Sequence, residues 1–168
     1  MASLEAGLRL VTLLTTDAVS STELQLRLKD HRSDLLRRER DGLVAREVES
    51  NRGHVVKSTG DGTFSAFKAP SEALTCAVAI QRAMARRNLG AHERIDLRIG
   101  LATGEVIVED DDIFGQASIL CTRITNRAAP GEVLCDETTR SLASARGDWQ
   151  VEPVGEVPLK GFDRGTPL

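Results

Sequence analysis

The sequence predicts one α+β domain whose strands and helices follow one another in the order β-α-β-β-α-β. Three observations support this class. Apolar runs typical of strands alternate with segments of helical periodicity, and a Gly-Asp-Gly turn joins two short runs of strand type. Strictly alternating apolar residues follow the second helical segment. The 168 residues are enough for one such domain and too few for two.

The N-terminal third of the chain predicts the first strand and the first helix. Apolar residues from Leu8 to Leu14 form a β-compatible run that ends at Asp17, which predicts a buried central strand. Residues 20–22 can cap a helix, and apolar residues then recur at helical spacing from about 23 to 50. The charges between them, such as those of residues 37–40, are interpreted as a solvated helix face.

A hairpin and a second helix follow. Residues 51–53 break the first helix, and residues 54–57 and 63–67 predict two strands joined by the tight turn Gly60-Asp61-Gly62. Pro70 opens the second helix, whose apolar residues share one face.

The remaining elements complete the predicted order. We expect strands at residues 95–101, 105–108 and 133–135 and around 151 and 157, and helices over 115–127 and 138–145. This order, with additional C-terminal α/β elements, is the ferredoxin-like pattern, and we expect its helices on one face of the sheet. No linker or repeat divides residues 1–168, so we interpret the chain as a single domain.

Composition excludes several classes of function. Aromatic residues make up 3% with no Tyr, and the net charge is −3, so neither base stacking nor a general nucleic-acid surface is expected. No apolar run approaches the ~20 residues that a membrane span needs, and no signal peptide is visible. The three widely spaced cysteines are expected to be buried and reduced, which favours a cytoplasmic location.

Two aspartates are candidate metal ligands. Asp17 ends the first strand just before a Ser/Thr-rich turn, where a carboxylate suits a hard divalent cation; the alternative is that it only caps the helix. Asp61 lies at the tip of the Gly-Asp-Gly hairpin, where the alternative is an ordinary turn. Because the first strand and the hairpin are neighbours in this topology, both carboxylates can meet at one edge of the sheet and hold two metals.

Five segments carry a resemblance to a known family. In order and with matching spacing, they are VTLLTTDAVSSTEL, VVKSTGDGTFSAF, LRIGLATGEV, DDIFGQA and LKGF. They resemble the characteristic blocks of class III adenylyl and guanylyl cyclase catalytic domains, especially the bacterial and mycobacterial single-domain type. The resemblance spans about Val11 to Phe162, which is nearly the whole chain.

The resemblance implies roles for four residues at the metal and base sites. Asp17 and Asp61 match the two metal-binding aspartates, which implies two divalent cations, Mg²⁺ or Mn²⁺. Lys57 and Asp112 match the pair that selects adenine. The chemistry agrees, because adenine offers an acceptor at N1 and a donor at its amino group, so Lys can donate and Asp can accept. ATP is therefore expected in preference to GTP.

Three cations match family residues that bind the phosphates. Arg98 matches a contact to the terminal phosphates, Arg123 the stabiliser of the transition state, and Lys160 the lysine that holds the triphosphate. The resemblance also implies a head-to-tail homodimer with shared sites. One subunit would supply Asp17, Asp61 and Arg98, and the other would supply the remaining four residues.

One position departs clearly from the family pattern. Ile119 stands where the family has an Asn, four residues before Arg123, and it cannot hydrogen-bond a ribose. The loss of one oriented donor typically costs about 10²–10³ in rate. Smaller departures are Thr15 in place of Phe and Ser20 in place of Gly.

Three alternatives to an adenylyl cyclase remain open from the sequence. The first is a degenerate domain, marked by Ile119, that binds nucleotide or a partner without turnover; the retained metal-type aspartates and purine-reading residues argue against it. A diguanylate cyclase shares the core order but needs an acidic pair in the hairpin, which Gly60-Asp61-Gly62 lacks. A guanylyl cyclase would typically carry Glu in place of Lys57.

Overall fold

The computed structural model describes residues 6–19, 28, 30–110, 112–144, 150–162 and 165–168. The predicted helix cap at 20–22 and most of the predicted first turns at 23–29 lie outside these residues. The elements appear in the predicted order: β1 (Gly7–Ala18), α2 (Asp30–Ser50), β2 (His54–Ser58), β3 (Gly62–Phe67), α3 (Pro70–Asn88) and β4 (Leu97–Glu109). They continue as β5 (Asp112–Phe114), α4 (Gln116–Arg127), β6 (Val133–Cys135), α5 (Glu137–Ser144), β7 (Glu156–Val157) and β8 (Thr166–Pro167).

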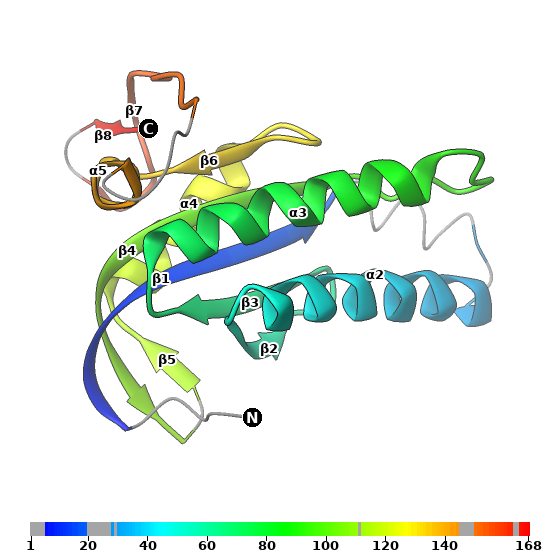
Figure 1. Ribbon diagram of the computed structural model, residues 1–168, viewed down its shortest axis with the longest axis horizontal. Helices are drawn as coiled ribbons and strands as arrows, with labels where there is room; N and C mark the ends of the chain where they lie inside the picture. Colours follow the sequence, from blue (N-terminus) through cyan, green and yellow to red (C-terminus); the bar gives the residue numbers. More distant parts are fainter. Residues whose placement is uncertain (1–5, 20–27, 29, 111, 145–149, 163–164) are drawn as a thin grey trace.

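The main sheet is mixed and is built around the two longest strands. Its path is β2-β3-β1-β4-β5 with antiparallel neighbours, and β6 adds to β4 in parallel. β1 pairs with β4 along its whole length, from Gly7↔Val108 to Ala18↔Leu97, whereas β3 covers only the half of β1 from Thr12 to Asp17. The other half of the β1–β4 ribbon extends beyond β3 as a bent arm (Figure 1).

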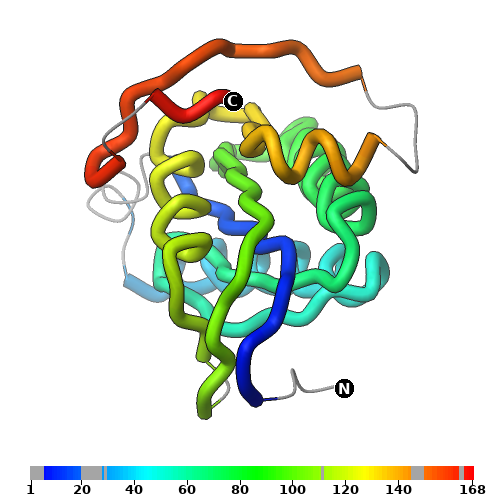
Figure 2. The backbone as a smooth tube through the Cα atoms, turned by 90° about the vertical axis from the view of Figure 1, so that its left-hand side faces the viewer, coloured from blue at the N-terminus to red at the C-terminus, as the bar shows by residue number. Residues whose placement is uncertain are grey.

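Helices cover both faces of this sheet, so the prediction of helices on one face is wrong. α2, α3 and α5 pack on the face that carries Leu14 and Ile99, while α4 packs on the face that carries Leu13 and Ala102. Figure 2 shows α3 and α4 on opposite sides of β1 and β4. The physical reason is visible in β1, where six successive residues are buried, because a strand buried on both sides needs a layer on each.

A glycine on β4 brings α4 close to the sheet. A Cβ at Gly100 would lie 2.4 Å from the backbone nitrogen of Thr125, so only glycine leaves room for the helix there. The close approach packs α4 against β1 and β4 and brings the hydroxyl of Thr125 within 3.4 Å of the carbonyl oxygen of Thr15 on β1. The position of α4 matters for the site, because the helix carries Ile119, Arg123 and Asn126.

Smaller predictions have mixed outcomes. The strands predicted at 95–101 and 105–108 form one continuous strand, β4, and β5 was not predicted. The strand expected around Val151 does not form, and β7 pairs with β8 instead. All three cysteines are buried and free, which confirms that prediction. Among the described residues, no helix combines the length and the apolar character that crossing a membrane requires.

Candidate functional site

The backbones that carry Asp17 and Asp61 lie side by side at one end of the sheet. Asp17, the penultimate residue of β1, is opposite Gly62 of β3 and Arg98 of β4. Asp61 directly precedes Gly62, and its carbonyl accepts a hydrogen bond from the N–H of Ala18 at 2.8 Å. The two aspartates are therefore joined through the residues next to them, although 44 positions separate them in the sequence.

Gly62 is required for this proximity. A Cβ on Gly62 would lie 1.7 Å from the carbonyl oxygen of Thr16, so β3 could not approach β1 at this register with any other residue. The neighbouring Thr63 N–H donates to the hydroxyl of Thr16 at 3.0 Å, which fixes the same pairing. The hairpin that carries Asp61 is thereby held against the end of β1.

Arg98 binds the carboxylate of Asp17. Its Nε and Nη2 atoms lie 2.8 and 2.7 Å from Oδ2 of Asp17, and both side chains are about 30% exposed. The guanidinium also donates to the carbonyl and to the side-chain oxygen of Asn126 at 3.0 and 3.1 Å. Asn126, at the end of α4, thus orients Arg98, and nothing in the sequence singled it out.

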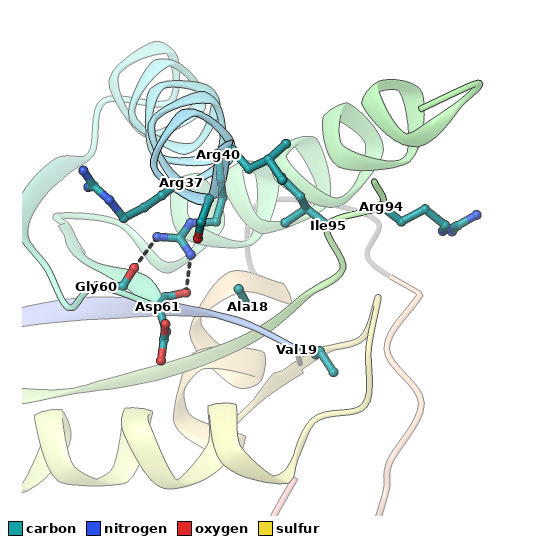
Figure 3. Close-up of a pocket in the computed structure, with 10 residues that line it drawn as sticks. Ala18, Val19, Arg37, Arg40, Gly60, Asp61, Arg94 and Ile95 are labelled. Atoms are coloured by element: carbon teal, nitrogen blue, oxygen red, sulfur yellow. Dashed lines mark hydrogen bonds between the residues drawn. The ribbon is translucent and has the colours of Figure 1, made fainter. Parts of the chain in front are cut away.

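Arg40 of α2 lies against the hairpin and corrects the interpretation of residues 37–40 as a solvated face. Its residue exposure is only 4%, and it donates to the carbonyls of Gly60 and Asp61. A hollow beside it is lined by Ala18, Arg40, Gly60, Asp61 and Ile95, among others (Figure 3). A sequence signal existed, because Arg40 lies four residues from Leu36 and Val44, on the apolar face of the helix.

Lys57 and Asp112 form a second group. The Lys57 ammonium lies 2.6 and 2.7 Å from the two carboxylate oxygens of Asp112 and 5.9 Å from the ring centroid of Phe64. The Lys57 contact, followed by the Ile113 N–H, lowers the pKa of the Asp112 carboxyl below its ordinary value. The pair presents a donor and an acceptor next to each other at a half-exposed surface, which suits recognition of a purine edge.

The other predicted residues belong to α4 and to the segment after β7. Ile119 and Arg123 are four residues apart and share a face of α4, and Ile119 is 53% exposed. Within the described residues, Nε of Arg123 is buried without a hydrogen-bond partner. Lys160 is exposed in the turn after β7, in a segment whose Val157 and Leu159 pack with the α4 core.

The donor chemistry of the first group suits a hard cation. Asp17 and Asp61 supply carboxylate oxygens, the ligand type that Mg²⁺ and Mn²⁺ prefer. The part of the chain that the structure describes contains no group of three or more His, Cys, Asp or Glu side chains that could hold a metal. Further ligands would have to come from elsewhere, and a triphosphate provides oxygens of the same kind.

Comparisons with known proteins agree on one family. Residues 8–167 match the family model of the "Adenylate and Guanylate cyclase catalytic domain". A Rhizobium meliloti (strain 1021) protein named "Putative adenylate cyclase 3" is 32% identical over 158 residues, which are 93% of this chain and 27% of that protein. This chain therefore spans about a quarter of the length of that relative.

Solved structures share the fold over almost the whole chain. The crystal structure of an adenylate/guanylate cyclase/hydrolase from Silicibacter pomeroyi is 30% identical, with a TM-score of 0.81 and coverage of 96% of this chain and 95% of that chain. The adenylyl cyclase CyaB from P. aeruginosa has a TM-score of 0.87 at 22% identity and covers 98% and 94% of the two chains. At that identity the second likeness bears on the fold alone.

Proposed function

The chain belongs to the family of adenylate and guanylate cyclase catalytic domains, and on that premise we propose that it is an adenylyl cyclase. It would convert ATP into 3′,5′-cyclic AMP and pyrophosphate. The observation that carries the choice of ATP is the Lys57–Asp112 pair, at 2.6 Å.

The pair suits adenine better than guanine. Adenine accepts a hydrogen bond at N1 and donates from its amino group, so it complements an ammonium beside a carboxylate. Guanine carries a proton at N1. This N–H and the Lys57 ammonium are both hydrogen-bond donors, so they could not bond to each other. A buried polar group left without a partner costs about 1–3 kcal/mol, so the mismatch disfavours GTP.

Asp17 and Asp61 are the residues that would hold two divalent cations, Mg²⁺ or Mn²⁺. When bound, the cations supply positive charge that lowers the pKa of the ATP 3′-hydroxyl and neutralises the triphosphate. Arg98 contacts Oδ2 of Asp17, so Oδ1 is the oxygen that Arg98 leaves to another ligand.

The reaction needs positioning and charge neutralisation more than a protein nucleophile. The 3′-oxygen attacks the α-phosphorus, the O3′–P bond forms, and the bond from the α-phosphorus to the β-phosphate oxygen breaks. The proton of the 3′-hydroxyl passes through solvent to the leaving pyrophosphate. Negative charge then builds on the leaving pyrophosphate. Arg98 and Lys160 would hold the phosphates, and Arg123 would stabilise the transition state, because fixed cations favour the state in which this charge has developed.

We propose that two copies share each site. Asp17, Asp61 and Arg98 form one group, while Lys57 and Asp112 pair elsewhere on the same chain, as expected if the second group serves the partner's metals. Arg123 and Lys160 would act with the second group.

An exposed apolar row supports a partner surface on the arm. Leu8 of β1, Ile107 of β4 and Phe114 of β5 lie directly opposite one another in register, and each is more than half exposed. Because contiguous exposed apolar side chains usually mark an interaction site, this row fits contact with a second copy.

The test is cyclic AMP formation from ATP with Mn²⁺ and with Mg²⁺, over a range of protein concentrations. Specific activity should rise with protein concentration, because a shared site forms only in the dimer. Asp17→Ala should abolish the product, and an equimolar mixture of Asp17→Ala with Lys57→Ala should recover part of it, because one of the two sites in the mixed dimer is intact. If the mixture is no more active than its Lys57→Ala component alone while mixed dimers form, the shared site is refuted.

A second candidate function follows from Ile119. An exposed isoleucine one turn before Arg123 gives no hydrogen bond to a ribose, which favours a domain that binds nucleotide without turnover. In that case ATP would bind in the presence of Mn²⁺, and no cyclic AMP would form at any protein concentration.

A further inference from the structure

Asp61 stands between two glycines, so neither neighbour has a side chain that could orient it. Gly60 has φ +86°, a conformation that glycine adopts without strain, and Gly62 lacks a side chain where β3 meets β1. A carboxylate that must meet a second carboxylate within a fraction of an ångström needs support from outside such a turn.

Arg40 supplies that support from helix α2. Its Nη1 donates to the carbonyl of Asp61 at 2.8 Å, and its Nη2 donates to the carbonyl of Gly60 at 2.7 Å. Its Nε and Nη2 also lie 2.9 and 2.7 Å from Oδ1 of Asp41, which fixes the plane of the guanidinium. A buried, always charged fork that holds two successive carbonyls fixes both position and orientation of the turn.

The Asp61 carbonyl is also the point where the hairpin joins β1. It accepts one hydrogen bond from Arg40 and another from the N–H of Ala18, the residue after Asp17. Figure 3 shows the Asp61 side chain pointing away from the Arg40 guanidinium. The clamp therefore grips the backbone and leaves the carboxylate available to a ligand.

We propose that Arg40, oriented by Asp41, is a positioning residue that sets the Asp61 carboxylate relative to Asp17 and thereby determines the affinity of the site for divalent cations. This inference rests on the proposed cyclase function. Arg40 acts through the backbone of residues 60–61, whose carbonyls it holds.

The experiment compares Arg40→Met, Arg40→Lys and Asp41→Asn with the wild-type chain. Free Mn²⁺ is titrated with protein and followed by its electron paramagnetic resonance signal, without nucleotide. Loss of a residue that orients a metal ligand typically weakens metal affinity about 10- to 100-fold. We expect the Mn²⁺ affinity of Arg40→Met to fall by a factor in that range. Arg40→Lys should resemble Arg40→Met, because the guanidinium reaches Asp41 and the two carbonyls with three separate nitrogens in a rigid plane, whereas an ammonium has only one nitrogen. Asp41→Asn should weaken binding less.

Kinetics supply a second readout. In Arg40→Met the Mn²⁺ concentration for half-maximal activity should rise about 10-fold or more, while KM for ATP at saturating Mn²⁺ changes less than about 3-fold. If Arg40→Lys retains wild-type Mn²⁺ affinity, the positive charge and not the two-carbonyl clamp is what matters, and the proposal is wrong.

Arg87→Met is the matched control for loss of a buried arginine. Arg87 has a side-chain exposure of 14% and ties α3 to Glu39 of α2 at 2.8 Å, away from the hairpin. It should lower the melting temperature and leave Mn²⁺ affinity unchanged. Equal weakening in Arg87→Met and Arg40→Met would reduce Arg40 to a structural role.

Asp61→Ala separates this inference from the function on which it rests. If Asp61→Ala binds Mn²⁺ as well as the wild type, the proposed metal site itself fails. If Asp61→Ala loses binding and folded Arg40→Met does not, only the role of Arg40 is refuted. Should Arg40→Met not fold, Asp41→Asn decides the question by the same measurement.

Discussion

Lys57 and Asp112 form an ion pair of 2.6 Å although they belong to the two outermost strands of the path β2-β3-β1-β4-β5. In a flat sheet with strands about 4.8 Å apart, four such spacings would separate them by roughly 19 Å. The pair forms because β5 joins only the far end of β4, on the arm beyond β3, and the arm bends back toward β2 (Figure 1). The curvature of the sheet thus creates the candidate base-reading pair.

Substitution of this pair should change nucleotide preference and leave the fold intact. A hydrogen bond to a charged group contributes about 1.5–3 kcal/mol, so Lys57→Met and Asp112→Asn should each lower kcat/KM for ATP about 10- to 100-fold. In the double variant, kcat/KM for ATP should fall by less than the product of the two single-variant factors, because the two residues act together. Unfolding free energies should change by less than about 1 kcal/mol for so exposed a pair. An unchanged ratio of ATP to GTP turnover would contradict the assignment.

The pKa of Asp112 should respond to Lys57. The ammonium hydrogen bond is the largest cause of the lowered pKa, so Lys57→Met should raise the Asp112 pKa toward its ordinary value of 3.8. A carboxyl whose pKa is lower in the folded state stabilises the fold above its unfolded pKa, and that stabilisation is lost as the pH falls through the folded pKa. The wild type should therefore lose more stability than Lys57→Met as the pH falls below 3.8.

Carbon-detected NMR of the Asp112 carboxyl, together with urea unfolding at pH 6 and pH 3, measures both effects. Lys68→Met is the control, because Lys68 is an exposed lysine outside the pair. A pKa that is the same in Lys57→Met and in the wild type would show that the ion pair does not persist in solution.

Local patterns predicted the elements better than their arrangement. Periodicity and the Gly60-Asp61-Gly62 turn predicted the strands and helices of the N-terminal half, because these features depend on neighbouring residues. The face that α4 covers depends on contacts between distant segments, of which the close packing of Thr125 on Gly100 is one. β5 was missed because three residues are too few for a periodic signal.

The candidate site was only partly accessible from the residues themselves. The meeting of the Asp17 and Asp61 segments follows from topology, whereas the contact of Lys57 with Asp112, 55 positions away, was available only through family resemblance. Arg40 could have been found from its spacing to apolar neighbours. The catalytic and binding roles of all seven residues stay predictions until they are measured.

Gly62 and Gly60 should differ sharply in their tolerance of alanine. A Cβ at Gly62 would meet the Thr16 carbonyl at 1.7 Å, and no side-chain rotation relieves a clash with backbone, so we expect Gly62→Ala to destabilise by about 3 kcal/mol or more. Gly60 has open space around it, so Gly60→Ala should cost only about 1 kcal/mol from its positive φ. Urea unfolding measures both. Equal losses of unfolding free energy in Gly62→Ala and Gly60→Ala would mean that the β1–β3 register differs from the one described.

The cysteines should be inert in the folded protein. Burial raises the pKa of the Cys76 and Cys121 thiols to about 12 and that of Cys135 to about 11, so hardly any thiolate is present at pH 8. Iodoacetamide should modify all three only after unfolding, which intact-protein mass spectrometry can count. Rapid modification of any of them in the native state would contradict its burial.

Ile119→Asn should raise the turnover of a weakly active enzyme. The side chain is 53% exposed and shares a face of α4 with Arg123, so an amide can replace it beside the proposed transition-state arginine without disturbing the core. One oriented hydrogen-bonding group is worth about 10²–10³ in rate, and we expect kcat to rise toward that range. The unfolding free energy should change by less than about 0.5 kcal/mol, as is usual for surface positions.

Thr122→Asn is the control for this substitution, because Thr122 is exposed on the same helix and adjacent to Arg123. It should leave kcat unchanged. If the wild type forms no cyclic AMP and Ile119→Asn does, the other predicted site residues support catalysis and Ile119 alone limits the rate. If the wild type is already active and Ile119→Asn adds nothing, another group orients the ribose. If both stay silent while ATP binds, the binding-module function replaces the cyclase, because restoring the missing donor did not restore the chemistry.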